Sequence, residues 1–225
     1  LFSGTSNITG NVNGAALTFT GNSTVGGSAT GTGNVLFSGT SNITGNVNGA
    51  ALTFTGDSTL GGAVNGTGDI LFSALSTIAG NITGGSALTF GGGTLLGGNV
   101  TSTGAQSYNA GAPFGTGAGG AVAVNGASII VAGPVILDRS AVFTAAGDVT
   151  FGGTILSASG DAGGNALTIN SPGITTFGGL VGGVAGQELA SIETDAAGTN
   201  RLNAALFATL GDQIFRGNTT LGADA

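Results

Sequence analysis

Residues 1–35 read LFSGTSNITGNVNGAALTFTGNSTVGGSATGTGNV, and residues 36–70 repeat them as LFSGTSNITGNVNGAALTFTGDSTLGGAVNGTGDI. The two copies are identical from Leu1 to Gly21 and from Leu36 to Gly56. A repeat of this length is typical of a solenoid, in which each repeat stacks on the next. A shorter repeat lies inside it, because phenylalanine recurs at every seventeenth or eighteenth position, at Phe2, Phe19, Phe37, Phe54, Phe72 and Phe90.

The apolar residues of each short repeat alternate with polar ones. Counted from its phenylalanine, the third unit carries its repeated small or apolar residues at even offsets only: Val35, Phe37, Gly39, Ser41, Ile43, Gly45 and Val47. A period of two indicates a β-strand, whereas a helix would have a period of 3.6. Thr, Ser and Asn occupy most of the odd offsets, so one face is expected to be buried and the other solvated.

These patterns predict an all-β fold, a parallel β-helix (β-solenoid) with seventeen or eighteen residues per coil. Neighbouring coils would pair in parallel, about 4.8 Å apart, and equivalent side chains would stack into columns. The predicted structural columns contain the six phenylalanines above and a second set of aliphatic residues: Ile8, Val25, Ile43, Leu60, Ile78 and Leu96.

Three segments differ in regularity. Residues 1–100 form regular coils in 35-residue double-coil repeats, and residues 136–225 follow the pattern in degenerate form. Residues 101–135 are expected to be an irregular coil or an insertion, with Pro113 and Pro134 at corners or in a loop, because proline cannot donate to a β-ladder. Residues 187–210 could form a helix or continue the strands, and the flanking turn sequences favour strands.

The composition excludes several classes of protein. The chain has 48 glycines, 6% charged residues and a net charge of −7, and its three Lys and Arg residues are too few and too scattered to bind nucleic acid. It contains no Cys, so neither a disulfide framework nor a thiolate metal site is possible. No continuous apolar run is long enough for a transmembrane helix, so no direct membrane insertion is expected. No signal peptide is evident, and the chain begins in mid-repeat, as expected of a piece of a longer protein.

Several segments of the second half resemble a known family. They are TSTGAQSYN (101–109), GDVTFGGTI (147–155), NALTINSPGITTFGGLVGGV (165–184), ETDAAGTNRLN (193–203) and NTTLGADA (218–225). They resemble the repeat regions of filamentous-haemagglutinin-like and autotransporter-like bacterial β-strand-repeat exoproteins. The resemblance implies a right-handed β-helix that is secreted and displayed on the bacterial cell surface, as part of an adhesin shaft.

Two roles are compatible with that resemblance. The first is a rigid extracellular spacer and contact surface of an adhesin, which could touch host or cell-surface carbohydrate or protein. The second is the building block of an extracellular filament, surface layer or matrix fibre, in which the partner is another copy or the neighbouring coils of the same long chain.

The titratable residues predict no enzyme, no metal site and no cofactor. Acid–base catalysis on sugars needs paired carboxylates on one face, but Asp57 and Asp69 are twelve positions apart and would not stack on adjacent coils. Glu188, Glu193 and Asp195 have no His, Lys or Cys nearby and are expected to be solvated. The tandem Gly-Gly-x-Gly-x-Asp motif of calcium-binding β-rolls is also absent.

Two polar arrays remain. Outward threonines beside the phenylalanines, such as Thr18 and Thr53, could order water as an ice-binding face does, but Leu36 and Leu71 interrupt that column. Asparagines also recur at one Gly-Asn corner, where a ladder that stabilises turns is the expected role. They are Asn11, Asn46, Asn81 and Asn99.

Overall fold

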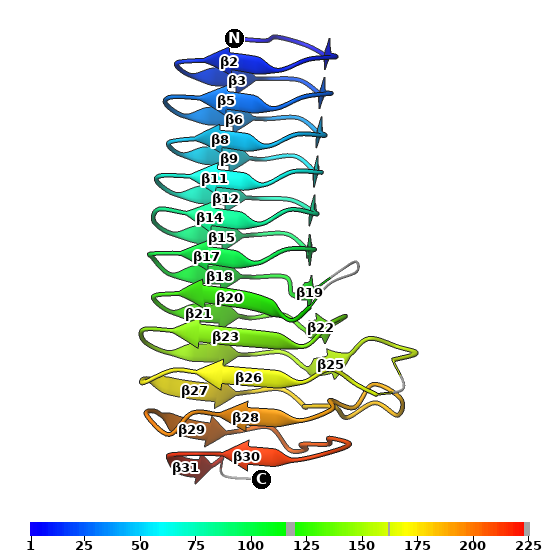
Figure 1. Ribbon diagram of the computed structural model, residues 1–225, viewed down its shortest axis with the longest axis vertical. Helices are drawn as coiled ribbons and strands as arrows, with labels where there is room; N and C mark the ends of the chain where they lie inside the picture. The colour runs from blue at the N-terminus through cyan, green and yellow to red at the C-terminus, as the bar shows by residue number, and fades with distance from the viewer. Residues whose placement is uncertain (116–119, 162, 223–225) are drawn as a thin grey trace.

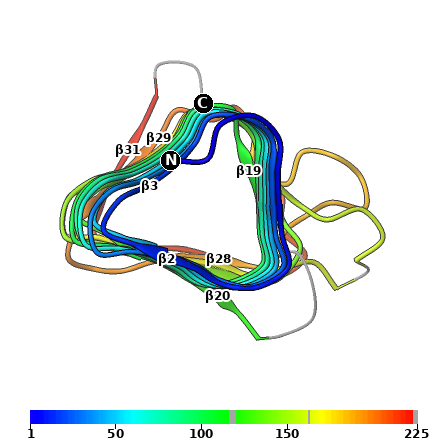
Figure 2. The ribbon, with the colours of Figure 1, turned by 90° about the horizontal axis from the view of Figure 1, so that it is seen from above.

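The computed structural model describes residues 1–115, 120–161 and 163–222. This part of the chain is all-β and contains no helix, and its strands stack into a long column (Figure 1). Three parallel sheets run along the column and enclose a triangular cross-section (Figure 2). The predicted β-solenoid is therefore confirmed. Nothing in the described ranges forms a helix that is long and apolar enough to cross a membrane.

Each coil up to β27 (Ile174–Phe177) contributes one strand to each sheet, and the last two described coils contribute strands to the second and third sheets only. The first sheet contains β1 (Ser6–Ile8), β4 (Ser23–Val25), β7 (Ser41–Ile43), β10 (Ser58–Leu60), β13 (Ser76–Ile78), β16 (Thr94–Leu96), β19 (Ala112–Phe114), β22 (Val135–Leu137) and β25 (Ile155–Ser157). The second contains β2 (Val12–Gly14), β5 (Ala29–Gly31), β8 (Val47–Gly49), β11 (Val64–Gly66), β14 (Ile82–Gly84), β17 (Val100–Ser102), β20 (Val122–Gly126), β23 (Ala141–Ala145), β26 (Leu167–Asn170), β28 (Ile192–Thr194) and β30 (Gln213–Phe215). The third contains β3 (Leu17–Phe19), β6 (Val35–Phe37), β9 (Leu52–Phe54), β12 (Ile70–Phe72), β15 (Leu88–Phe90), β18 (Gln106–Tyr108), β21 (Ile129–Val131), β24 (Val149–Phe151), β27 (Ile174–Phe177), β29 (Thr199–Leu202) and β31 (Asn218–Leu221).

The solenoid is right-handed. Seen from the N-terminal end in Figure 2, the chain passes clockwise from the sheet of β19 to that of β20 and then to that of β3 and β29. The same path carries the chain away from the viewer, from the N-terminus towards the C-terminus (Figure 1). This is the hand that the family resemblance implies.

Most strands are only three residues long, and their alternation places two side chains inside and one outside. In β6, Val35 and Phe37 are buried while Leu36 points outward. Glycine at the corners lets adjacent coils approach. A Cβ added at Gly45 would lie 2.7 Å from the carbonyl carbon of Gly27 in the coil before it, so only glycine fits there. The enclosed side chains form one continuous hydrophobic core.

The predicted coil length, seventeen or eighteen residues, holds for the first coils only. Phe72 pairs with Phe90 and Leu96 with Phe114, but Val100 pairs with Val124 and Ala141 with Leu167. Chain excursions that leave the triangular outline, mostly on the side of the first sheet, contain the added residues (Figure 2). Isolated bridges from Ile155 to Val181 and from Val181 to Phe207 continue the first sheet beyond β25.

The segment predicted to be irregular, residues 101–135, contains the last two residues of β17, all of β18 to β21 and the first residue of β22, and all three sheets pass through it without a break. Between β19 and β20, residues 116–119 lie outside the described ranges. Pro134 precedes β22, at a corner, but the corner prediction was wrong for Pro113, which lies inside β19. Since proline has no N–H, the ladder between β16 and β19 is reduced to the pair Leu96–Phe114, whereas β19 and β22 pair over their whole length.

Residues 187–210 continue the β-structure, as the flanking turn sequences predicted. They contain β28 and β29, and no helix lies in this range. The spacing of four between Leu202, Leu206 and Leu210 does not mark a helical face, because Leu202 is buried while the other two are exposed.

Candidate functional site

The predicted phenylalanine column exists as a stack of parallel rings inside the third sheet. The ring centroids of successive members, from Phe2 to Phe90, are 4.5 to 5.2 Å apart, and their planes lie within 8° of parallel. Phe2 is partly buried and the other five are fully buried. The stack extends one coil further, because the ring of Tyr108 lies 4.8 Å from that of Phe90.

The second predicted column lines the inside of the first sheet. Ile8 pairs with Val25, Val25 with Ile43, and the register then continues through the remaining members to Leu96. All are buried except Ile8, which is partly buried. These two columns are core, so the sequence-predicted residues position the coils and carry no reactive group.

A buried polar network, which the sequence analysis did not identify, lies below the aromatic stack. The Tyr108 hydroxyl donates to Gln106 Oε1 at 2.9 Å, and Gln106 Nε2 donates to Ser102 Oγ at 3.1 Å and to the Asn125 carbonyl oxygen at 2.6 Å. Burial raises the pKa of Tyr108 far above its ordinary value of 10.0, because the charged phenolate would be desolvated. The side-chain polar atoms of the network are satisfied internally.

The carboxylates act mainly as hydrogen-bond acceptors at corners. Asp57 Oδ1 accepts from the Leu75 N–H at 3.2 Å, and Asp69 Oδ1 accepts from the Ala87 N–H at 3.1 Å, each one coil further along. The predicted corner asparagines, Asn11, Asn46, Asn81 and Asn99, accept in the same way from the backbone of the next coil. Within the described ranges, no three His, Cys, Asp or Glu residues lie close enough together to hold a metal ion.

The columns of outward-pointing side chains on the three sheets differ in how regularly the same residue types recur. On the third sheet, Leu36 lies between Thr18 and Thr53, and Leu71 follows, so apolar side chains interrupt the threonine column as the sequence predicted. On the first sheet, the outward column changes from Asn and Thr to Leu95 and then Pro113.

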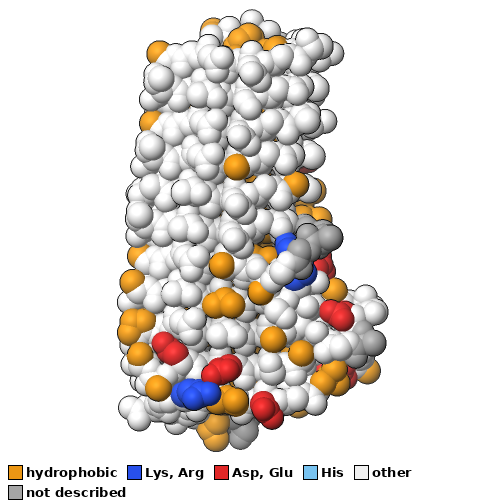
Figure 3. Space-filling view, viewed as in Figure 1, with side chains coloured by type: hydrophobic (Ala, Val, Ile, Leu, Met, Phe, Trp, Pro, Cys, Tyr) orange, Lys and Arg blue, Asp and Glu red, His pale blue; other side chains and the backbone are white. Residues whose placement is uncertain are grey.

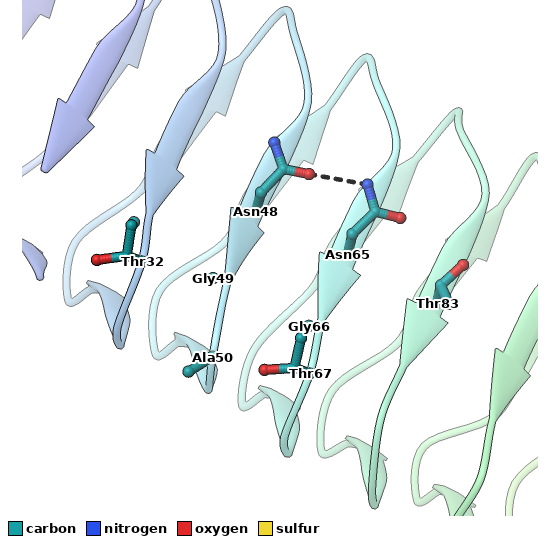
Figure 4. Close-up of a pocket in the computed structure, with 9 residues that line it drawn as sticks. Thr32, Asn48, Gly49, Ala50, Asn65, Gly66, Thr67 and Thr83 are labelled. Carbon is teal, nitrogen blue, oxygen red and sulfur yellow. Dashed lines mark hydrogen bonds between the residues drawn. The ribbon is translucent and has the colours of Figure 1, made fainter. Parts of the chain in front are cut away.

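The second sheet alone carries an outward column of Asn and Thr that runs through nine coils. This asparagine–threonine column is Asn13, Thr30, Asn48, Asn65, Thr83, Thr101, Asn125, Thr144 and Asn170. Its amides form hydrogen bonds along the axis. Asn48 Nδ2 donates to Thr30 Oγ1 at 3.1 Å. Asn65 Nδ2 donates to Asn48 Oδ1 at 2.9 Å, as Figure 4 shows.

A groove follows this column along the solenoid axis. Its first part has a volume of about 380 Å³, and its walls are Asn48, Asn65 and Thr83 on one side and Thr32, Ala50 and Thr67 on the other (Figure 4). A second hollow of about 410 Å³ begins at Ser102 and Thr103, in the coil after Thr83, and reaches Ala146. We call the two together the axial groove.

The floor of the axial groove is bare backbone, for a reason that lies in the core. Cβ atoms added at Gly31, Gly49 and Gly66 would point inward and meet core side chains, for example Leu52 Cδ2 at 2.7 Å from the Cβ at Gly49. Glycine is therefore required at these positions by the packing of the core, and an inward-facing position presents only backbone on the outside. The recurrence of Asn or Thr directly after Val or Ile, as in Val47-Asn48 and Ile82-Thr83, is the sequence signal that marks this wall.

Among the described residues, no charged side chain lines the axial groove. Asp57 and Asp69 are the only charged side chains that precede Asp138 in the sequence, and both lie at corners, where they accept backbone hydrogen bonds. Figure 3 shows the face around the axial groove: its upper part carries no charged side chain, and the charged groups gather near the C-terminal end and at the side.

Comparisons with known proteins found no relative of this chain. A scan against protein-family models, a search of curated proteins and a search of solved structures each returned no match to this chain. The fold is therefore known from the structure alone, and the resemblance to filamentous-haemagglutinin-like repeats remains an expectation.

Proposed function

We propose that this chain is a rigid shaft segment of a secreted bacterial surface adhesin, which acts as an extracellular spacer and contact surface. The observation that carries the proposal is the continuity of the solenoid: one hydrophobic core and a parallel hydrogen-bonded ladder run from β2 to β30 without a gap. Every coil is held to the next on three sides, so bending would break several ladders together. The proposal assigns no catalytic role and no cofactor to the chain.

Electron microscopy of the native full-length product on its cells tests this proposal, together with antibodies against residues 1–100. We expect labelled, thin, single rods that project from intact cells and are removed by external protease. Labelling that appears only after the cells are permeabilised would overturn the extracellular assignment.

A second role, the building block of an extracellular filament, surface layer or matrix fibre, is favoured by one observation. Because Asp57 and Asp69 are the only charged side chains before Asp138, copies of the chain could lie side by side with little electrostatic repulsion. Periodic assemblies of many chains in the same micrographs would support this role instead of the single-rod adhesin.

A further inference from the structure

We propose that the axial groove binds an uncharged, unbranched β-1,4-linked glycan, which lies parallel to the solenoid axis. The shape of the groove indicates a linear ligand. The hollow at Thr32–Thr83 and the hollow at Ser102–Ala146 follow one another along the axis in adjacent coils. From Gly31 to Ala145 they span seven coils, which corresponds to a length of about 29 Å at the usual separation of strands. A planar crystal surface would not enter such a hollow.

The chemistry of the groove fits a sugar chain. Asn48 and Asn65 use one N–H each for the ladder along the column, so each amide keeps a second N–H and at least one oxygen lone pair that can face a ligand. Thr32 and Thr67 add hydroxyls on the opposite wall. The floor between them presents backbone, and Ala50 adds a methyl group beside it. Hydroxyl groups of a sugar can therefore bond at the rims while its C–H face lies on the floor.

Charge narrows the class of ligand. None of the described residues that line the groove is charged, so an anionic polymer such as a nucleic acid or a uronic-acid glycan would find no cation to pair with. A neutral polyhydroxyl chain needs no ion pair and gains hydrogen bonds from amides and hydroxyls.

The spacing of the walls favours the β-1,4 linkage. On the outer wall of the first hollow, Ala50 lies between Thr32 and Thr67, so the two hydroxyls are two coils, or about 9.6 Å, apart. An extended β-1,4-linked glycan turns each sugar over relative to the last and repeats every second sugar at nearly this distance. An α-1,4-linked glucan coils and would not follow the straight axis of the groove.

Titration of the 225-residue protein with defined oligosaccharides, followed by isothermal calorimetry and by NMR of the asparagine side-chain amides, tests the proposal. We expect cellohexaose or chitohexaose to bind at least about fivefold more tightly than the corresponding trisaccharide, because a longer chain meets more coils. Maltohexaose and a hexamer of galacturonic acid should bind more weakly by at least the same factor. Equal binding of all four hexasaccharides, or no binding of either β-1,4-linked one, would overturn the proposal.

Two variants locate the binding in the groove. Ala50→Leu fills the hollow without touching the Asn48–Asn65 ladder, and Asn48→Ala with Asn65→Ala removes the amides; each should lower the affinity for the better hexasaccharide at least about fivefold. Asn42→Ala with Thr59→Ala, on the outward face of the first sheet, is the matched control and should leave the affinity unchanged. Loss of binding in the control, or unchanged binding in both groove variants at an unchanged melting temperature, would contradict the assignment. This proposal does not depend on the role as a shaft, and the cell-surface experiment and the titration can fail independently.

Discussion

At the scale of single residues, identical side chains in adjacent coils decide whether a column is stable. Stacked phenylalanines bury large apolar surface and keep their rings parallel, as Phe19, Phe37 and Phe54 do. Buried serines of adjacent coils satisfy each other's hydrogen-bonding groups, since Ser41 Oγ donates to Ser58 Oγ at 3.1 Å inside the core. Apolar and polar columns can therefore lie side by side in one narrow interior.

Phe37→Asp tests the aromatic column. Phe37 is fully buried between two stacked rings, so aspartate would place an unpaired charge in the core and lower the free energy of unfolding by at least about 4 kcal/mol. Thr40→Asp is the control, because Thr40 is exposed and Asp57 already occupies the next position of its column. Thermal melting measures both. Equal melting temperatures for the two variants would contradict the stacked column.

The buried Tyr108 predicts loss of stability at alkaline pH. Its pKa is raised in the folded chain, whereas an unfolded tyrosine ionises near pH 10. The stabilisation is therefore complete below about pH 10 and is lost as the pH rises above it, because only the unfolded chain releases the proton. Tyr108 is the only tyrosine and there is no tryptophan, so tyrosinate absorbance reports on it alone. Ionisation near pH 10 with the β-sheet circular dichroism unchanged would contradict this prediction.

At the scale of the coil, corners set how closely two coils approach. One corner column is glycine in six successive coils, Gly10, Gly27, Gly45, Gly62, Gly80 and Gly98. From Gly27 onward, an added Cβ would meet the backbone or an amide oxygen of the coil before it at less than 3 Å. The requirement for glycine at this corner thus comes from the neighbouring coil.

The variants Gly45→Ala and Gly10→Ala form a matched pair that tests whether contact with the neighbouring coil requires glycine at this corner. The new methyl group at Gly45 would lie 2.7 Å from the Gly27 carbonyl carbon, so we expect a loss of about 1–3 kcal/mol in urea unfolding. Nothing lies within 4 Å of the corresponding Cβ at Gly10, so that change should stay within about 1 kcal/mol. A similar loss in both variants would show that backbone conformation, and not contact between coils, requires the glycine.

At the scale of the whole molecule, the solenoid is close to a one-dimensional stack, in which each coil contacts only its neighbours. The coil at the end is less covered than a coil with neighbours on both sides: the side chains of β9 are mostly buried, whereas those of β31 are all exposed. Only one ion pair, between Arg216 and Glu193 at 2.8 Å, occurs in the described part, and it is exposed to solvent. Stability therefore rests on core columns and ladders rather than on charge.

Hydrogen exchange of the backbone amides should follow this difference in burial. We expect the backbone amides of β29 and β31 to exchange at least about tenfold faster than those of β9 and β12, because local opening requires less buried surface to be exposed. Mass spectrometry of peptic fragments after exchange in deuterated buffer measures this in the intact chain. Uniform exchange rates from β9 to β31 would show that the coils open as a single cooperative unit.

Much of the fold was determined by the sequence alone. The regular recurrence of phenylalanine from Phe2 to Phe90 defined the coil, and the alternation around Val35 and Phe37 defined which side chains point inward. Both are local properties, since a strand fixes the direction of each side chain by its position. The turn residues of the flanking sequences correctly favoured strands over a helix in residues 187–210.

Only the tertiary structure decided how the coils align after the repeat lengthens. Which residue of the next coil lies opposite determines three features: the strand position of Pro113, the contacts of Gln106 with Ser102 and Tyr108, and the corner role of Asp57. The axial groove also depends on this alignment, because Asn48 and Asn65 lie opposite each other on the outside of adjacent coils. The spacing of equivalent residues along the sequence identifies a stacked column only while every coil has nearly the same length. Once excursions of different length separate the strands, register is set by packing between coils, and that information is distributed over residues far apart in the sequence.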